Sequence, residues 1–294
     1  MYLDKKRVNT KFLPGIRIPR GITITSDLKK AVSGSSLIVV AVPSQYMRGV
    51  LRKIDAAGVP ESVPFLSVSK GVEDRTLLRM SEVIEDVLGN RQVAVLSGPT
   101  ISYEVARGLP TTVVVASKNT ALAKKIQGIF SAPAFRIYTS DDIYGVELGG
   151  ALKNVIAIAA GALDGLGLES NTKAGLITRG LVEISRLGVA MGARRETFFG
   201  VSGLGDLVTT CISGHGRNRW FGEQIGKGKK TKDILKKTDM VVEGVVTAKS
   251  AYQLAKKYKV EMPVVEQVYN VLYKNKPLKK AIADLMNRPL KSEN

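Results

Sequence analysis

The segment SLIVVAVP, residues 36–43, is a run of apolar and β-branched residues without alternating polar positions. Such a run is typical of a strand that a parallel sheet buries on both faces. Further strand-like segments occur on either side of it, and helical patterns lie between them. These segments are ITIT (22–25), PFLSVSK (64–70), VAVLSG (93–98), TTVVVAS (111–117) and FRIYTS (135–140). This alternation of strand and helix predicts an open α/β sheet with helices on both faces.

The strand signal stops near residue 142, and helical patterns continue from there to the end of the chain. In the first half, the helical patterns are SDLKKAV, SQYMRGVLRKI, RTLLRMSEVIEDVL, ISYEVARG and NTALAKKIQGIF. We therefore predict an α/β domain over residues 1–142 and an all-helical domain over residues 143–294.

The segment GGALKNVIAIAAG, residues 149–161, carries a lysine, Lys153, in an otherwise small and apolar helical pattern. Gly149 and Gly150 lie on the face opposite the aliphatic stripe, so nearly the whole circumference is apolar or tiny. A helix that is apolar all round is usually buried. A buried lysine needs a partner or a chemical task.

The composition is that of an ordinary soluble globular protein, with 294 residues, 44% hydrophobic and 24% charged. The single cysteine, Cys211, excludes an internal disulfide framework and suits a reducing compartment. The opening MYLDKKRVNTKF does not resemble a signal peptide. Apolar runs such as VIAIAAGAL are shorter than the ~20 residues that a membrane span needs. We expect a cytoplasmic protein that is not an integral membrane protein.

The net charge of +18 is compatible with nucleic acid, an acidic membrane surface or small anionic substrates as partners. The basic residues are dispersed, with short runs such as KGKKTK at 227–232. The sequence shows neither zinc-ligand spacing nor an aromatic RNA-binding run. We interpret the lysines mainly as a solvated face and expect no nucleic-acid partner.

Three predicted strands end in residues that suit a ligand site. In an open α/β sheet, ligands bind in the crevice beyond the carboxyl ends of the strands, and free N–H groups at helix starts attract anions. Each residue also has a simpler explanation, because Lys70 fits a solvated loop and Thr100 fits an N-cap. The residues are Pro43 and Ser44, then Lys70 and Gly71, then Ser97, Gly98 and Thr100.

With these residues in place, the chain closely resembles the bacterial NAD(P)-dependent glycerol-3-phosphate dehydrogenase family. The resemblance covers essentially all 294 residues. It implies reversible reduction of dihydroxyacetone phosphate to sn-glycerol 3-phosphate for phospholipid synthesis, with NAD or NADP as cofactor, in a homodimer formed by the helical domain. The matching segments are RVNTKFLPGIRIP, AVPSQ, SKGVE, VLSGPT, EVARGLPT, GVELGGALKNVIAIAAG, SGLGDLVTTC, RNRWFG and VVEGV.

The resemblance gives Lys153 the role of proton donor and acceptor at the C2 oxygen of the substrate. Burial would lower its pKa toward the working range of a general acid–base. The small neighbours Gly149, Gly150 and Ala157 are expected to leave room for the substrate. The alternative is a lysine that reaches the surface. His215, in a glycine-rich loop, is interpreted as incidental, and no metal site is expected.

The remaining roles are also implied by the resemblance. Lys70 would contact both cofactor and substrate, and Gly98 and Thr100 would hold the substrate. Asp206 would bind the substrate hydroxyls and orient Lys153, although an aspartate in SGLGDL also fits a turn. The phosphate would lie against Gly216, Arg217 and Asn218, with Arg217 also reaching the cofactor. The other cofactor contacts would be Ser102, Val241 and Glu243.

The sequence departs from the family pattern at Gly216, where a serine is usual, and at Glu169–Ser170, where Gly-Asp is usual. We also find no G-x-G-x-x-G turn between a strand and a helix. We therefore expect an N-terminally truncated Rossmann-like parallel sheet, lacking the first strand, helix and strand, about 30–40 residues. Segment 36–43 would then lie at a bare sheet edge, and ITIT would lack a partner on its inner side.

Several alternatives stay open at this point. One is a non-catalytic truncated relic that has lost cofactor binding, and another is a basic nucleic-acid-binding protein. A third is a different α/β-plus-helical dehydrogenase, such as a ketopantoate or 3-hydroxyacid reductase. The combination of GGALKN, SGLGDL and RNR argues against the third.

Overall fold

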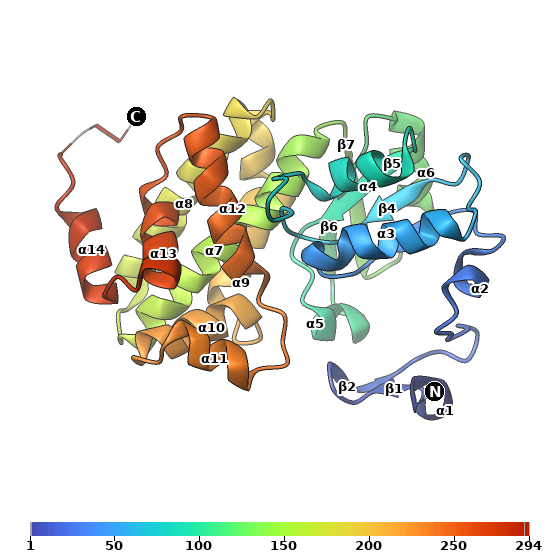
Figure 1. Ribbon diagram of the computed structural model, residues 1–294, viewed down its shortest axis with the longest axis horizontal. Helices are drawn as coiled ribbons and strands as arrows, with labels where there is room; N and C mark the ends of the chain where they lie inside the picture. The colour runs from blue at the N-terminus through green and yellow to red at the C-terminus, as the bar shows by residue number, and fades with distance from the viewer. Residues whose placement is uncertain (1, 291, 294) are drawn as a thin grey trace.

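A computed structural model describes residues 2–290, 292 and 293, and Figure 1 shows a sheet domain followed by a helical domain. The main sheet of the described residues has the order β3-β4-β5-β6-β7. Its first three strands are parallel, β6 and β7 are parallel, and β5 and β6 are antiparallel. The strands are β3 (Ile38–Val40), β4 (Phe65–Ser67), β5 (Val93–Ser97), β6 (Thr111–Ala116) and β7 (Phe135–Ser140).

The Rossmann-like fold is thus confirmed, with one antiparallel pair that the sequence did not reveal. Parallel neighbours require a crossover that returns the chain to the starting edge of the sheet. The connection from β5 to β6 holds only the short helix α5 (Ser102–Ala106). Because this connection does not return to the starting edge, β6 runs back beside β5 in the opposite direction.

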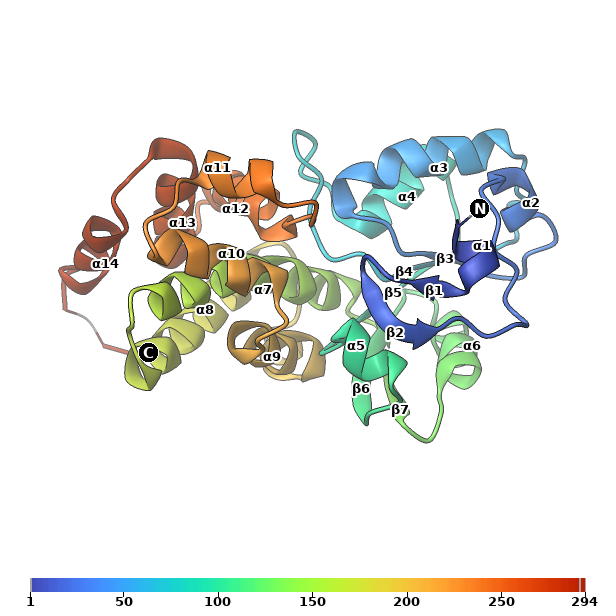
Figure 2. The same ribbon diagram turned by 90° about the horizontal axis from the view of Figure 1, so that it is seen from below.

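Helices cover both faces of the sheet. Figure 2 shows α3 (Met47–Ala56) and α4 (Met80–Leu88) on one side and α6 (Thr120–Phe130) on the other. Neighbouring residues of β4 point to opposite faces, because Phe65 packs with the α3–α4 core and Leu66 with the α6 core. The unalternating strand pattern is therefore explained by two covered faces.

The predicted strand ITIT at 22–25 is wrong. Among the described residues the sheet ends at β3, which pairs only with β4, and residues 22–25 do not pair with its open edge as a strand. The guanidinium of Arg7 donates to the Ile22 carbonyl at 2.7 Å, and the side chain of Thr25 turns toward the chain that follows, where its Oγ1 accepts the N–H of Asp27 at 3.0 Å. Ahead of it lie the unpredicted helix α1 (Tyr2–Lys6) and a hairpin of β1 (Val8–Asn9) and β2 (Leu13–Arg17).

The predicted helix over 75–88 also begins later than expected, at Met80. Arg75 and Leu77 have φ values of 72° and 61°. This left-handed backbone cannot continue an α-helix, so α4 starts after it, with Arg79 as its N-cap. The remaining helices of the sheet domain are α2 (Leu28–Val32) and the 3-10 turn η1 (Ser44–Tyr46).

The second half of the described chain is helical, as predicted, and α7 (Ile143–Gly165) forms its centre. Around α7 lie α8 (Ser170–Ala190), η2 (Arg195–Phe199), η3 (Val201–Gly205), α9 (Asp206–Ile212), α10 (Arg217–Gly226), α11 (Thr231–Lys237), α12 (Glu243–Lys257), α13 (Pro263–Lys274) and α14 (Leu278–Met286). The length and apolar composition of α7 would also suit a membrane span, but 89% of its most apolar window is buried inside the fold. Helix α7 is therefore the core helix of this domain.

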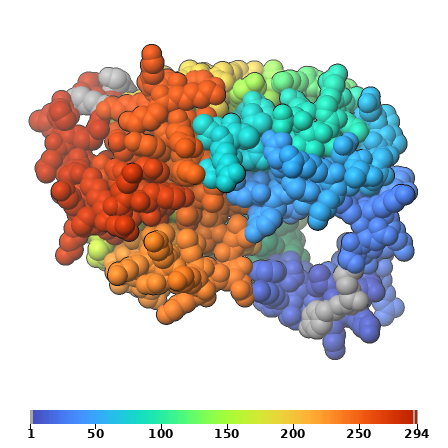
Figure 3. All heavy atoms as spheres, in the orientation of Figure 1, coloured from blue at the N-terminus to red at the C-terminus, as the bar shows by residue number. Residues whose placement is uncertain are grey.

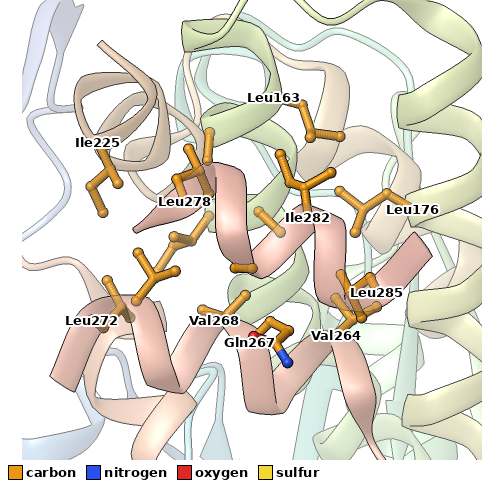
Figure 4. A pocket seen from close by; sticks show the side chains of 15 residues that line it. Leu163, Leu176, Ile225, Val264, Gln267, Val268, Leu272, Leu278, Ile282 and Leu285 are labelled. Carbon is orange, nitrogen blue, oxygen red and sulfur yellow. The ribbon is translucent and has the colours of Figure 1, made fainter. Parts of the chain in front are cut away.

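The outermost helices close the core from the side opposite the sheet domain. Helices α13 and α14 enclose an apolar pocket with α7 and α8, and its lining side chains point inward in Figure 4. Gln267 is the polar residue of this lining, and its side-chain oxygen accepts a hydrogen bond from Lys276 at 2.6 Å. Helix α13 is capped by the buried carboxylate of Glu183, which accepts the N–H groups of Val264 and Val265.

A buried ion pair fixes α7 against the sheet domain. Glu147 accepts the backbone N–H of Ser81 at 2.8 Å and its hydroxyl at 2.6 Å, and it also pairs with the guanidinium of Arg79. Burial raises the pKa of the Glu147 carboxyl above its usual range. The first turns of α4 and α7 are thus held together two turns before Lys153.

Glycines allow α7 and α10 to touch backbone to backbone. A Cβ atom on Gly161 would lie 1.8 Å from the Arg219 carbonyl oxygen, and one on Gly222 would lie 1.9 Å from that of Ile158. Gly165 and Gly226 repeat this contact one turn later, at 2.3 and 2.4 Å from backbone oxygens. Because no side chain fits between the two backbones, this contact fixes the position of α10 against α7.

Gly161→Ala is therefore expected to lower the free energy of unfolding by about 3 kcal/mol or more, because the new methyl group forces two backbones apart. Gly175→Ala is the matched control. Gly175 also lies in a helix, α8, but nothing lies within 4 Å of a Cβ placed there. This control should stabilise the protein by about 0.5–1 kcal/mol. Urea unfolding of both variants measures the difference, and equal effects would contradict the packing described here.

Candidate active site

Two lysines and one aspartate meet where the sheet domain faces the helical domain. Lys70 follows β4, Lys153 lies in the middle of α7, and Asp206 is the first residue of α9. Lys153 Nζ donates to Asp206 Oδ1 at 2.5 Å, and Lys70 Nζ donates to Asp206 Oδ2 at 2.7 Å. One buried carboxylate therefore bridges both domains, and the structure brings together three residues selected from the sequence.

Lys70 is held by the end of β5 as well. Its ammonium donates to the Gly98 carbonyl at 2.7 Å and to Thr100 Oγ1 at 3.2 Å. Gly98 has a φ of +143°, and a Cβ there would lie 3.0 Å from the Val113 Cα atom. Only glycine fits this backbone. The turn after β5 thus presents a carbonyl and a hydroxyl to Lys70, as the position of both at a strand end suggested.

Lys153 combines burial with a titratable amine. It is 6% exposed, and burial lowers the pKa of its ammonium to about 8. The positive charge of Lys70 acts in the same direction, while Asp206 opposes both. An amine with this pKa can both give and take a proton near neutral pH. The cluster carries two ammonium groups and one carboxylate, so it also favours an approaching anionic or partly negative oxygen.

Thr210 belongs to this cluster but was missed in the sequence. Its Oγ1 accepts a hydrogen bond from Lys153 Nζ at 2.6 Å. The signal was available, because Thr210 lies four residues after Asp206, and residues at this spacing share one face of a helix. Asp206 and Thr210 together fix the ammonium of Lys153 from one side.

The expectation that Gly149 and Gly150 leave room for a substrate beside Lys153 is wrong. A Cβ on Gly149 would lie 2.8 Å from the Ser202 carbonyl oxygen, and one on Gly150 would lie 2.5 Å from Ser97 Oγ. The third small neighbour, Ala157, is fully buried. These small residues let η3 and the end of β5 pack closely against α7.

The start of α10 brings one exposed cation to the site. Arg217 is exposed, and among the described residues its guanidinium makes no hydrogen bond or ion pair. Asn218 is engaged, because its amide donates to Asn154 at 3.0 Å and accepts the N–H of Gly244 at 2.9 Å. Asn218 thus ties α10 to α7 and α12 in this structure, and Arg217 stays available.

Three other predicted residues lie further from the lysine pair. Gly216 is the residue just before α10, without a side chain to contribute. Ser102 begins α5 and is exposed, and Val241 is 37% exposed. In the described part of the chain, the Ser102 hydroxyl makes no hydrogen bond to the residues of the cluster.

Glu243 forms a second link between the domains, at the start of α12. Its carboxylate accepts the N–H of Ser44 at 2.8 Å and the Ser44 hydroxyl at 2.5 Å. Burial raises the pKa of Glu243 above its usual range. A Cβ on Gly71 would lie 2.4 Å from Ser44 Oγ, so this glycine permits the contact. Ser44 and Glu243 were each selected from the sequence, but the hydrogen bonds between them were not predicted.

The buried hydroxyl of Ser97 has no hydrogen-bond partner among the described residues, although it lies beside the stem of Lys70. A buried polar atom without a partner is rare. It therefore indicates where a bound molecule would supply one. His215 is exposed, and burial raises the pKa of the Cys211 thiol to about 12. No metal-binding cluster of His, Cys, Asp and Glu occurs in the described residues.

Comparison with known families gives two matches that together span most of the chain. Residues 2–123 match the model of the NAD-dependent glycerol-3-phosphate dehydrogenase N-terminus. Residues 142–283 match the model of the C-terminus of the same family. The second match begins one residue before α7.

Individual relatives agree with this result. The chain is 49% identical over 290 residues to a glycerol-3-phosphate dehydrogenase [NAD(P)+] of Geobacter sp. (strain M21), covering 98% of this chain and 86% of the relative. It is 50% identical over 293 residues to the enzyme of the same name from Fusobacterium nucleatum, covering 99% and 87%. The crystal structure of glycerol-3-phosphate dehydrogenase from Coxiella burnetii superposes with a TM-score of 0.94 at 36% identity, covering 98% of this chain and 88% of that one.

The expected loss of the N-terminal segment is not borne out. The N-terminal family model is matched from residue 2 onward. Our prediction relied on one motif, the glycine-rich turn, whereas the match extends over the strands and loops of residues 2–123. The absence of one motif does not measure how much of a domain is present.

Proposed function

Because the chain belongs to the NAD-dependent glycerol-3-phosphate dehydrogenase family, we propose that it catalyses reversible hydride transfer between NAD(P)H and dihydroxyacetone phosphate. The product, sn-glycerol 3-phosphate, provides the backbone for phospholipid synthesis. The observation that carries the proposal is the buried Lys153–Asp206–Lys70 cluster, in which an amine with a pKa of about 8 faces the junction of the two domains.

Lys153 is the proton donor of the reduction and the proton acceptor of the oxidation. When the ketone is reduced, the carbonyl oxygen gains negative charge and takes a proton from the ammonium of Lys153. In reverse, the neutral amine removes the hydroxyl proton. Asp206 orients the amine and hydrogen-bonds the substrate hydroxyls, while Lys70 stabilises the developing charge.

The substrate is held by groups from both domains. Gly98 and Thr100 lie at the end of β5 next to Lys70. The phosphate binds at the start of α10 through Arg217, Asn218 and the backbone of Gly216. The exposed guanidinium of Arg217 supports this assignment, because a planar fork without an internal partner suits a phosphate.

The residues present fit the nicotinamide end of NAD or NADP, which supplies the hydride when bound. The partnerless Ser97 hydroxyl and the ammonium of Lys70 lie at the carboxyl edge of the parallel strands, where α/β folds bind such cofactors. Ser102, Val241, Glu243 and Arg217 are the further residues that we assign to contact the cofactor. Glu243 already orders this edge by accepting two hydrogen bonds from Ser44.

We assign the dinucleotide-binding domain to residues 1–142 and the substrate domain to residues 143–294. The start of α7 at Ile143 supports this boundary.

We further propose a cytoplasmic homodimer that associates through the helical domain, where Val189, Phe199 and Met286 expose apolar side chains. Light scattering should give twice the chain mass of 31.7 kDa, and a monomer at assay concentration would contradict the dimer.

Lys153→Met should reduce kcat for dihydroxyacetone phosphate reduction by roughly 10²–10⁴-fold, because the proton donor is lost. In the unmodified protein, kcat/KM for reduction should fall as pH rises through about 8, because deprotonation of Lys153 removes the acid. For glycerol 3-phosphate oxidation the same titration should raise kcat/KM. Steady-state kinetics in both directions across this pH range measures the opposite slopes.

Asp206→Asn provides a second readout for the same prediction. Removing the carboxylate takes away the charge that holds the pKa of Lys153 up, so the midpoint of the profile should move to lower pH. Lys53→Met, at an exposed lysine of α3, is the control and should change neither rate nor profile. Parallel slopes in the two directions, or a profile unmoved by Asp206→Asn, would exclude Lys153 as the acid–base group.

Arg217→Met should raise KM for dihydroxyacetone phosphate by about 10- to 100-fold, because a charged hydrogen-bonding partner of the phosphate is removed. The reduction of dihydroxyacetone, which lacks the phosphate, should be equally slow in the variant and in the unmodified protein. Arg52→Met, at an exposed arginine of α3, serves as the charge-matched control. A similar loss with both substrates would place Arg217 outside the phosphate site.

A further inference from the structure

A pocket of about 430 Å³ lies between α10 and α11, and no role in the dehydrogenase reaction has been assigned to it. Its walls include Trp220 from α10, Lys229 and Lys230 from the connecting turn, and Asp233 and Lys237 from α11. The volume falls within the range of about 300–1,000 Å³ that small-molecule sites occupy. None of the residues of the Lys153–Asp206–Lys70 cluster lines it, so it is separate from the catalytic cleft.

The charge in this pocket is not balanced. Three lysines and one aspartate, all exposed, line it, and among the described residues the side chains of Lys230, Lys237 and Asp233 have no hydrogen bond or ion pair. Lys229 is positioned by its hydrogen bond to the side-chain oxygen of Gln224 at 2.6 Å. An anionic ligand would bind favourably here because it would neutralise several unpaired lysines that line one pocket.

The lysines of the pocket lie in the most basic part of the chain. Residues 227–237 contain six lysines and one aspartate, a net charge of +5. Residues 227–294 carry +9 of the total of +18 in less than a quarter of the chain. The N-terminal hairpin lies next to this basic segment. Lys11 pairs with Asp239 at 2.8 Å, and Figure 3 shows the two segments side by side.

Trp220 adds a planar apolar surface to the pocket. It is half-buried, packs on the helical core and also lines the pocket. It lies one turn after Arg217 on α10, so a ligand on the indole contacts the helix that presents Arg217 to the substrate. Trp220 is also the single tryptophan of the chain, so its fluorescence reports on α10 and on this pocket.

We propose that the α10–α11 pocket binds a chain of phosphate groups, carried either by inorganic polyphosphate or by a nucleoside polyphosphate. Lysine ammonium groups bind phosphates as point charges, and several linked phosphates match several unpaired lysines better than one monoanion does. The indole would provide a stacking surface if the ligand carries a base. This site is independent of the proposed dehydrogenase function.

The test is a titration of the full chain with tripolyphosphate and with ATP, followed by Trp220 fluorescence and calorimetry. Both ligands should change the fluorescence saturably, more weakly at high salt, and saturating NAD⁺ should not displace tripolyphosphate. Equal affinities would identify the phosphate chain alone as the ligand, and tighter ATP binding would identify a nucleotide on the indole.

The double variant Lys230→Glu/Lys237→Glu should weaken binding by at least about tenfold, because two attractive charges become repulsive. Lys124→Glu/Lys125→Glu makes the same charge change on exposed residues of α6 and should leave affinity within about twofold after allowance for screening. Lys230→Gln/Lys237→Gln gives a milder change in case the first variant folds poorly. The proposal is overturned by no saturable binding of either ligand, by unchanged affinity in both pocket variants, or by equal losses in the pocket and α6 variants.

Discussion

The Asp206 carboxylate is the group on which the geometry of the site depends. It is 1% exposed and bridges Lys70 of the sheet domain and Lys153 of the helical domain. Without it, two ammonium groups would face each other in a site with little water, and leaving a buried charge unpaired costs several kcal/mol. The same carboxylate keeps the pKa of Lys153 from falling further below about 8. Domain docking and proton transfer therefore rely on one residue.

Helix α7 makes this arrangement possible because glycines on several of its faces let neighbouring elements approach its backbone closely. Gly149 and Gly150 bring η3 and β5 close to Lys153, and Gly161 brings α10 into backbone contact. Each glycine weakens the helix by roughly 0.5–1 kcal/mol relative to alanine. Burial on all sides offsets this cost. The small residues that were expected to leave room for a substrate pack the elements that carry the other site residues.

The sequence predicted those features whose causes are local or periodic. Strands β3 to β7 followed from apolar runs, and Lys153 stood out because a lysine interrupts an apolar helix. ITIT has a strand-like composition but forms no strand pairing, and its Ile22 carbonyl instead accepts a hydrogen bond from the distant Arg7 side chain; the reversal of β6 depends on a connection whose path has no sequence pattern. The Ser44–Glu243 contact joins residues 199 positions apart, which periodicity cannot detect.

The high positive charge has more than one physical origin. In the catalytic cleft, two lysines are partly compensated by Asp206, and Arg217 is the further cation near the site. The dispersed lysines of α6 and α14 fit the interpretation as a solvated face. That interpretation does not explain Lys229, Lys230 and Lys237, which line one concave surface together with an indole. Like charges gathered around a cavity raise the free energy of the empty protein, and an anion would remove that cost. The proposed polyphosphate ligand would account for this gathering of lysines on one concave surface.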